Sequence, residues 1–107
     1  MKYNKLVRDK IPEIISRQGD RPVTHILDTK LYKQELIKSK LQEEIAEFSD
    51  SDRVEELVDV LEVAYALAKE KGVSQYQLEE MRQQKRSNRG GFDQRVFLEE
   101  IIPANAS

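Results

Sequence analysis

The helix predicted from about Val54 to Lys71 constrains the fold most, because its apolar residues cover two sides of it. At about 100° per residue, one apolar stripe consists of Val60, Val63 and Leu67. A second, longer stripe consists of Val54, Leu57, Val58, Leu61, Ala64, Tyr65 and Ala68. A helix that is apolar on two sides is buried or lies between partners. The chain is therefore predicted to fold as a helical bundle around this helix.

A second long helix is predicted from about Thr29 to Phe48, with Asp28 or Thr29 as its N-cap. Its apolar residues follow the spacing i, i+4, i+8 and i+11, which predicts one buried face; they are Ile37, Leu41, Ile45 and Phe48. A shorter helix is expected to open at Asp9, with Pro12 in its first turn. Asp52 and Glu55 form a candidate capping box for the helix that begins near Val54.

The remaining pattern predicts a fourth helix over residues 75–88 and two short strands. Residues 22–27 and 95–102 contain β-branched and aromatic side chains, and the two segments are predicted to pair. The expected fold is mainly α: about four helices with short terminal strands, in one domain over residues 1–107.

Composition excludes several classes of protein. The net charge of −2 argues against a protein whose main role is non-specific nucleic-acid binding. The absence of cysteine excludes disulfides and Cys-based zinc sites. The N-terminal residues lack the apolar core of a signal peptide, and no apolar run is long enough to span a bilayer. A cytoplasmic protein with no membrane partner is expected. His25, the one histidine, is expected to be structural or exposed.

Two consecutive helices each carry a pair of acids three residues apart, Glu44 with Glu47 and Glu56 with Asp59. On a helical wheel, each pair lies beside apolar residues. If the helices pack antiparallel across the turn at residues 49–53, the four carboxylates come close together. Such a cluster raises pKa values or binds a cation. Oxygen ligands without His or Cys favour Mg²⁺, with Mn²⁺ as the alternative.

The simpler interpretation of these acids is that they form solvated helix faces paired with lysines. That interpretation suits a single pair of glutamates. Two pairs on consecutive helices, both beside apolar stripes, favour metal binding. The bases close by in sequence, Lys40 and Arg53, are too few to neutralise four acids.

Three motifs in order carry a resemblance to a known family. They are "YNKLVRDKIPEII" at the start, "EEIAE" followed by "EELVD" in the middle, and "NRGGF" near the end. Together they resemble the MazG-like all-α nucleoside triphosphate pyrophosphohydrolases, and in particular the small phosphoribosyl-ATP pyrophosphohydrolase-like proteins. The acidic motif here comprises Glu43, Glu44, Glu47, Glu56 and Asp59. The gap of eight residues between Glu47 and Glu56 is shorter than usual in that family.

The resemblance implies that a nucleoside triphosphate is hydrolysed to the monophosphate and pyrophosphate. It implies that Glu44, Glu47, Glu56 and Asp59 bind Mg²⁺, and Glu44 or Glu47 is the candidate general base. Phosphates also need cations and backbone N–H groups. The candidates for substrate binding are Lys5, Arg8, Lys85, Asn88, Arg89 and Gly91.

Two alternatives to this function stay open. One is a phosphoribosyl-ATP pyrophosphohydrolase of histidine biosynthesis, and the other is a non-catalytic helical module that dimerises. In each case a homo-oligomer is expected, because a monomer of this length is predicted to leave Val60, Val63 and Leu67 exposed.

Overall fold

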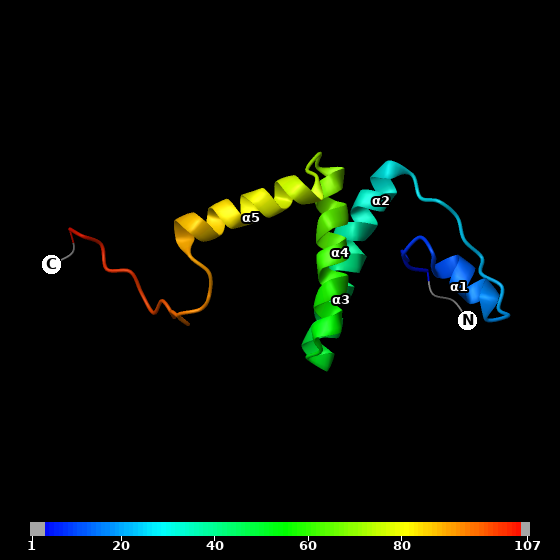
Figure 1. The fold of residues 1–107 in the computed structure, drawn as a ribbon, viewed down its shortest axis with the longest axis horizontal. Coiled ribbons are helices and arrows are strands. Elements are labelled where there is room, and N and C mark those ends of the chain that lie inside the picture. The colour runs from blue at the N-terminus through cyan, green and yellow to red at the C-terminus, as the bar shows by residue number, and fades with distance from the viewer. Residues whose placement is uncertain (1–3, 106–107) are drawn as a thin grey trace. The chain divides into compact units, whose positions relative to one another are not determined.

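The computed structural model describes residues 4–105, and these residues fold into helices (Figure 1). The helices are α1 (Ile11–Arg17), α2 (Thr29–Glu35), the π-helix η1 (Leu36–Lys40), α3 (Leu41–Ser51), α4 (Val54–Glu70) and α5 (Gln75–Arg89). The mainly α fold class predicted from the sequence is confirmed. The chain divides into two compact units, Met1–Gln75 and Tyr76–Ser107. The single domain expected over residues 1–107 stays a prediction.

The first unit is organised by the packing of α3 against α4. The two helices lie side by side, joined by the turn at Asp52 and Arg53, and η1 also packs against α4 (Figure 1). The buried apolar side chains among the described residues are few: Leu36, Val63 and Ala68. The small core therefore comes from η1 and α4, and the hairpin of α3 and α4 is the frame on which the acids are mounted.

The predicted helix caps hold in one case and fail in two. Asp28 caps α2, accepting a hydrogen bond from the backbone N–H of Leu31 at 2.9 Å. The prediction that Asp9 caps α1 is wrong, because Lys10 occupies that position without a side-chain cap. Asp52 does not open α4 either. Since α3 continues past Phe48 to Ser51, Asp52 falls at the end of α3, in the left-handed region with φ of 57°.

The apolar stripe of α4 that was predicted to be exposed is covered, and part of the other stripe is exposed. Val63 is buried, with 7% of its surface exposed, and Val60 and Leu67 are half-buried. This stripe is covered because α4 turns it toward η1 and α3. The exposed apolar side chains of α4 are instead Val54, Leu57, Val58 and Leu61. The prediction that Val60, Val63 and Leu67 form an exposed patch is therefore wrong.

The π-helix η1 changes which side chains of the long helix face inward. The backbone N–H of Leu41 donates to the carbonyl of Leu36, a spacing of five residues instead of four. Leu36 is 3% exposed, whereas its neighbour Ile37 is 53% exposed. Ile45 is also exposed. The predicted buried face fails at Ile37, because the wheel assumed an uninterrupted α-helix, and it also fails at Ile45, which lies beyond the π-turn in α3.

Neither predicted strand forms: residues 22–27 and 95–102 adopt no regular secondary structure. Their β-branched and aromatic side chains are largely exposed, including Val23, Ile26, Val96 and Phe97. A strand needs hydrogen bonds from a neighbouring strand, and β-propensity alone does not supply them. In the part of the chain that the structure describes, no helix has the length and apolar character needed to cross a bilayer.

Candidate metal centre

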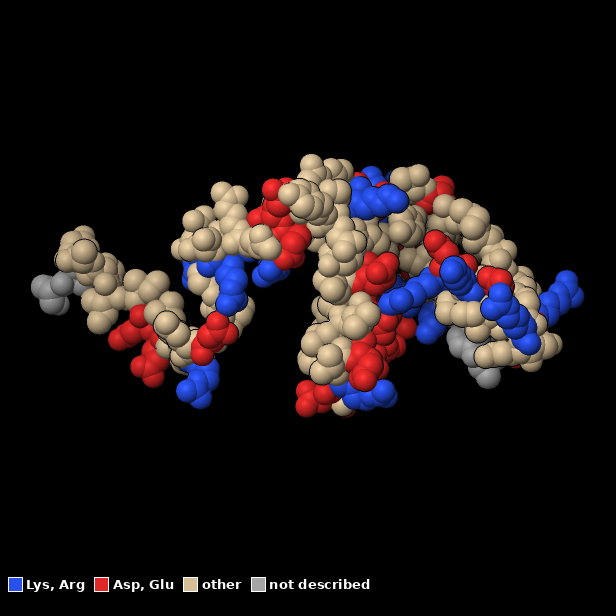
Figure 2. Space-filling model, viewed as in Figure 1, with Lys and Arg blue, Asp and Glu red and all other residues tan. Residues whose placement is uncertain are grey.

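The four acids singled out in the sequence converge on one side of the α3–α4 hairpin. Glu44 and Glu47 project from one turn of α3, and Glu56 and Asp59 from one turn of α4. One oxygen from each carboxylate lies within 4.8 Å of the others. Figure 2 shows acidic atoms gathered over these two helices, with basic atoms beside them. The i, i+3 spacing aligns each pair, and the short turn brings the pairs together.

Glu44 is the most buried member of this acid cluster, with 6% of its surface exposed. Its Oε1 atom lies 3.3 Å from the Lys40 ammonium. Its Oε2 atom is buried and receives no hydrogen bond from any described residue. A buried carboxylate oxygen without a donor is costly, so this atom favours an additional positive partner such as a cation or a proton.

The negative charge of the cluster affects the pKa of Glu47. Its pKa is raised because a hydrogen bond between its carboxyl group and that of Glu44 favours the protonated form. Burial and the negative charges of Glu44, Glu43 and Glu56 act in the same direction. Glu47 thus holds a proton more readily than an ordinary glutamate in the absence of a bound cation.

Glu43 points to a different set of partners and stands outside the cluster. Its carboxylate lies 3.1 Å from the Lys5 ammonium and 3.5 Å from that of Lys40. Burial opposes ionisation of Glu43, but these two ammonium groups outweigh it, and the pKa of Glu43 is lowered. The hydrogen bond to Glu43 in turn raises the pKa of Lys5. Glu43 therefore anchors the N-terminal segment to α3.

Arg8 reaches the cluster directly. Its Nη2 atom lies 2.5 Å from Oδ1 of Asp59, across 51 residues of sequence. The sequence identified Arg8 only as a candidate for substrate binding. No spacing rule connects residue 8 to residue 59, so this contact could not be read from the sequence. The contacts of Lys40 can be predicted from the sequence, because Lys40 lies three and four residues before Glu43 and Glu44 on the same helix.

The donor set fits a hard divalent cation. All four groups are carboxylates, and Mg²⁺ and Mn²⁺ prefer oxygen ligands. Only two basic side chains, Lys40 and Arg8, form ion pairs with the four acids among the described residues. The orphaned oxygen of Glu44 and the raised pKa of Glu47 both indicate room for further positive charge.

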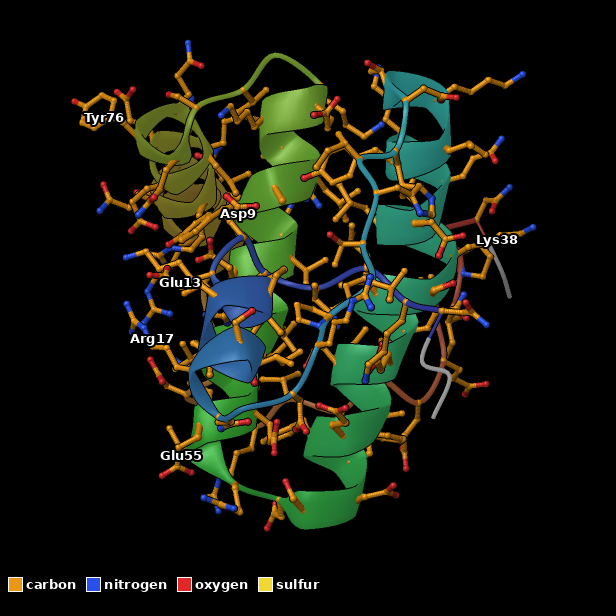
Figure 3. All side chains as sticks on the ribbon, turned by 90° about the vertical axis from the view of Figure 1, so that its right-hand side faces the viewer. Asp9, Glu13, Arg17, Lys38, Glu55 and Tyr76 are labelled. Carbon is orange, nitrogen blue, oxygen red and sulfur yellow. The ribbon has the colours of Figure 1, made fainter. Side chains whose placement is uncertain are left out.

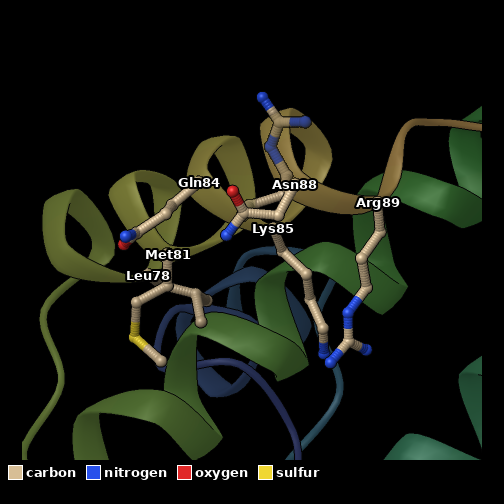
Figure 4. A pocket seen from close by; sticks show the side chains of 7 residues that line it. Leu78, Met81, Gln84, Lys85, Asn88 and Arg89 are labelled. Carbon is tan, nitrogen blue, oxygen red and sulfur yellow. The ribbon is translucent and has the colours of Figure 1, made fainter.

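The other predicted substrate contacts lie in the second unit. Lys85, Asn88 and Arg89 share a pocket lined by α5 alone, together with Leu78, Met81, Arg82 and Gln84 (Figure 4). Lys85 and Arg89 extend from the same side of the helix (Figure 4). Gly91 lies against Arg86, since a Cβ at position 91 would overlap the guanidinium group. Arg86 is held in turn by Asp93 at 2.9 Å.

Comparison with known proteins places the chain in a family. The family model described as phosphoribosyl-ATP pyrophosphohydrolase matches residues 8–86. The matched residues include Arg8, the four clustered acids and Lys85, and end before Asn88 and Arg89. Neither the curated proteins nor the solved structures yielded a match.

Proposed function

The chain belongs to the phosphoribosyl-ATP pyrophosphohydrolase family, of the MazG-like all-α superfamily, and we propose that it is a Mg²⁺-dependent nucleoside triphosphate pyrophosphohydrolase of the cytoplasm. Enzymes of this family hydrolyse a phosphoric anhydride bond of a nucleotide and are typically metal-dependent. The proposed products are the nucleoside monophosphate and pyrophosphate. The observation that carries the proposal is the convergence of Glu44, Glu47, Glu56 and Asp59 within 4.8 Å.

These four carboxylates would hold the cation. When bound, a divalent cation shields phosphate charge and makes water a stronger acid. The orphaned oxygen of Glu44 supports this assignment, because a cation would give that buried atom the partner it lacks. The shortened gap between Glu47 and Glu56 does not keep the two helices from bringing their acids together.

Glu47 is the better candidate for the general base. A general base must be within reach of the water whose proton it takes. The side chain of Glu47 is exposed, so water can reach it, whereas Glu44 is buried. Glu44 is then best suited to holding the cation. Lys5 and Arg8 border the cluster and supply positive charge toward phosphate oxygens. Lys85, Asn88, Arg89 and Gly91 are proposed as further nucleotide contacts.

Phosphoribosyl-ATP is the second candidate substrate, and the description of the matched family favours it. Both reactions hydrolyse an anhydride bond and release pyrophosphate, so the acid cluster serves either one. Phosphoribosyl-ATP carries an additional phosphoribosyl group, which a simple nucleoside triphosphate lacks. Hydrolysis of nucleoside triphosphates would suit the removal of unwanted nucleotides. Hydrolysis of phosphoribosyl-ATP would suit histidine biosynthesis.

A panel of nucleotides distinguishes these functions. We expect pyrophosphate release with Mg²⁺ from at least one canonical or modified nucleoside triphosphate, with no release after chelation of the metal. Turnover of phosphoribosyl-ATP alone would select the biosynthetic role. Mg²⁺ without nucleotide should also raise the melting temperature, since saturation at 100 times Kd stabilises a fold by about 2.7 kcal/mol. If the protein neither hydrolyses any nucleotide nor responds to Mg²⁺, the acids are better explained as a docking surface of a non-catalytic module.

We also propose a homo-oligomer, with its interface on the exposed stripe of α4. Leu57, Val58 and Leu61 are exposed apolar side chains on a regular helix, and few apolar side chains of the described residues are buried within the chain. Val63 is a poor probe of this interface, because it is buried within the chain.

The substitution Leu61→Glu places a charge on this stripe. It should convert the oligomer to monomers in light scattering at micromolar concentration, with the helix content unchanged. Glu62→Gln is the matched control, because it changes charge on the adjacent exposed position of the same helix. A wild-type protein that is already monomeric across a dilution series would show that the stripe is not an interface.

A further inference from the structure

The N-terminal segment, residues 4–10, lies against the acid cluster without forming a helix or strand. Two side chains attach it: Lys5 to Glu43 on α3, and Arg8 to Asp59 on α4. The two attachments differ in kind. Glu43 stands outside the four acids that can surround a cation, whereas Asp59 is one of them. Lys5 therefore binds an acid outside the cluster, whereas Arg8 binds a candidate metal ligand.

We propose that Arg8 is an exchangeable cation, which pairs with Asp59 until a divalent metal takes that carboxylate and then transfers to a phosphate of the nucleotide. This inference rests on the proposed function, because it needs both the metal and the nucleotide. It assigns Arg8 two successive partners. Removing the guanidinium group should therefore strengthen metal binding and weaken nucleotide binding.

The Arg8–Asp59 pair suits such an exchange because it is exposed. The two side chains are 54% and 38% exposed, so water screens their attraction and the pair contributes little to folding. A divalent cation carries twice the charge of the guanidinium group and binds the other three acids at the same time. It therefore displaces Arg8 from Asp59, and the two positive groups then repel each other.

The displaced guanidinium remains beside the site. Lys5 keeps the segment attached through Glu43, which is not one of the four clustered acids. A nucleotide bound to the cation brings phosphate oxygens to this place. The planar guanidinium group can bind two of those oxygens at once, which an ammonium group cannot do in the same geometry. Arg8 thus changes one anionic partner for another, and the segment need not leave α3.

The test separates metal binding from nucleotide use in the full-length protein. Affinity for Mn²⁺ alone is measured by calorimetry, and KM and kcat are measured with Mg²⁺ and the best nucleotide of the panel. Arg8→Gln should bind Mn²⁺ roughly two- to fivefold more tightly, the factor expected on removing an exposed ion pair. Its KM should rise about tenfold or more, because a charge-assisted hydrogen bond to phosphate is lost.

Arg17→Gln is the matched control. Arg17 forms a comparable exposed ion pair with Glu13 at 2.6 Å within α1, and Figure 3 shows both side chains on that helix. This variant should leave both affinities unchanged. Arg8→Lys keeps the charge and should restore Mn²⁺ affinity to the wild-type value, but it should recover KM only in part.

Three results would overturn the exchange: unchanged or weaker Mn²⁺ binding by Arg8→Gln, an unchanged KM in that variant, or equal effects in Arg17→Gln. Failure of the proposed function looks different, because the wild-type protein itself would then bind no Mn²⁺. A helical circular dichroism spectrum for Arg8→Gln confirms that the comparison is made between folded proteins.

Discussion

Replacing Asp59 with asparagine should lower Mg²⁺-dependent nucleotide hydrolysis by at least about 100-fold, because even indirect supports of a metal site commonly contribute 10- to 100-fold. Asp59 is one of the four carboxylates of the described residues that converge on the site. An amide carries no negative charge, so the variant loses attraction for the cation while keeping nearly the same shape. The measurement is pyrophosphate release at saturating nucleotide, over a titration of Mg²⁺.

The fold should survive this substitution. Asp59 is partly exposed, and its contact with Arg8 is screened by water. Removing the negative charge of Asp59 also removes its repulsion with Glu44, Glu47 and Glu56. We therefore expect the melting temperature without metal to be unchanged or higher, and the rise caused by Mg²⁺ to disappear.

Asp50→Asn is the matched control for this test. Asp50 undergoes the same chemical change in the same hairpin, but it is exposed near the end of α3 and outside the cluster. It should keep full activity and the full response to Mg²⁺. If Asp59→Asn retained wild-type activity, the acid cluster would not be the site of metal-dependent hydrolysis.

Truncating Leu36 to alanine should lower the free energy of unfolding by about 2–5 kcal/mol, the cost of creating a cavity at a buried leucine. Leu36 is 3% exposed and belongs to a core that contains few other buried apolar side chains. It also lies in η1, which packs against α4. The loss should appear as a lower midpoint in urea unfolding, with little change in slope.

Ile37→Ala provides a stringent control, because the two residues are adjacent and similar in size. Ile37 is 53% exposed, so its truncation should cost no more than about 0.5 kcal/mol. Measuring both variants at low protein concentration keeps any association out of the comparison. Equal losses for the two variants would contradict the orientation of η1, and a larger loss for Ile37 would restore the face predicted from an uninterrupted helix.

The acid cluster was predictable because its geometry depends on local rules. Two i, i+3 pairs on regular α-helices separated by a short turn fix which carboxylates share a face, and Glu44, Glu47, Glu56 and Asp59 meet as expected. The buried faces of the same helices were predicted less well. Which apolar stripe of α4 is covered depends on where η1 and α3 pack, and a helical wheel contains no information about neighbouring elements.

The contacts of the N-terminal segment show the second limit of sequence reasoning. Arg8 and Lys5 were identified as cations that phosphates need, but their partners Asp59 and Glu43 lie 51 and 38 residues away. Only folding brings such residues together. The predicted strands failed for a related reason. Residues 95–102 have the composition of a strand, but composition does not provide the partner that a strand requires.

The five-residue turn of η1 has a consequence for how the long helix can change. A turn closed by a bond from Leu41 to Leu36 contains one residue more than an α-turn, so it offsets the helical phase by about 100°. The side chains of α2 are thus rotated by this angle from the positions they would have if one uninterrupted α-helix continued into α3. Glu44 and Glu47 lie after this turn, in the regular helix that begins at Leu41. A single extra residue in η1 therefore decides which side chains of α2 share a helix face with Glu44 and Glu47.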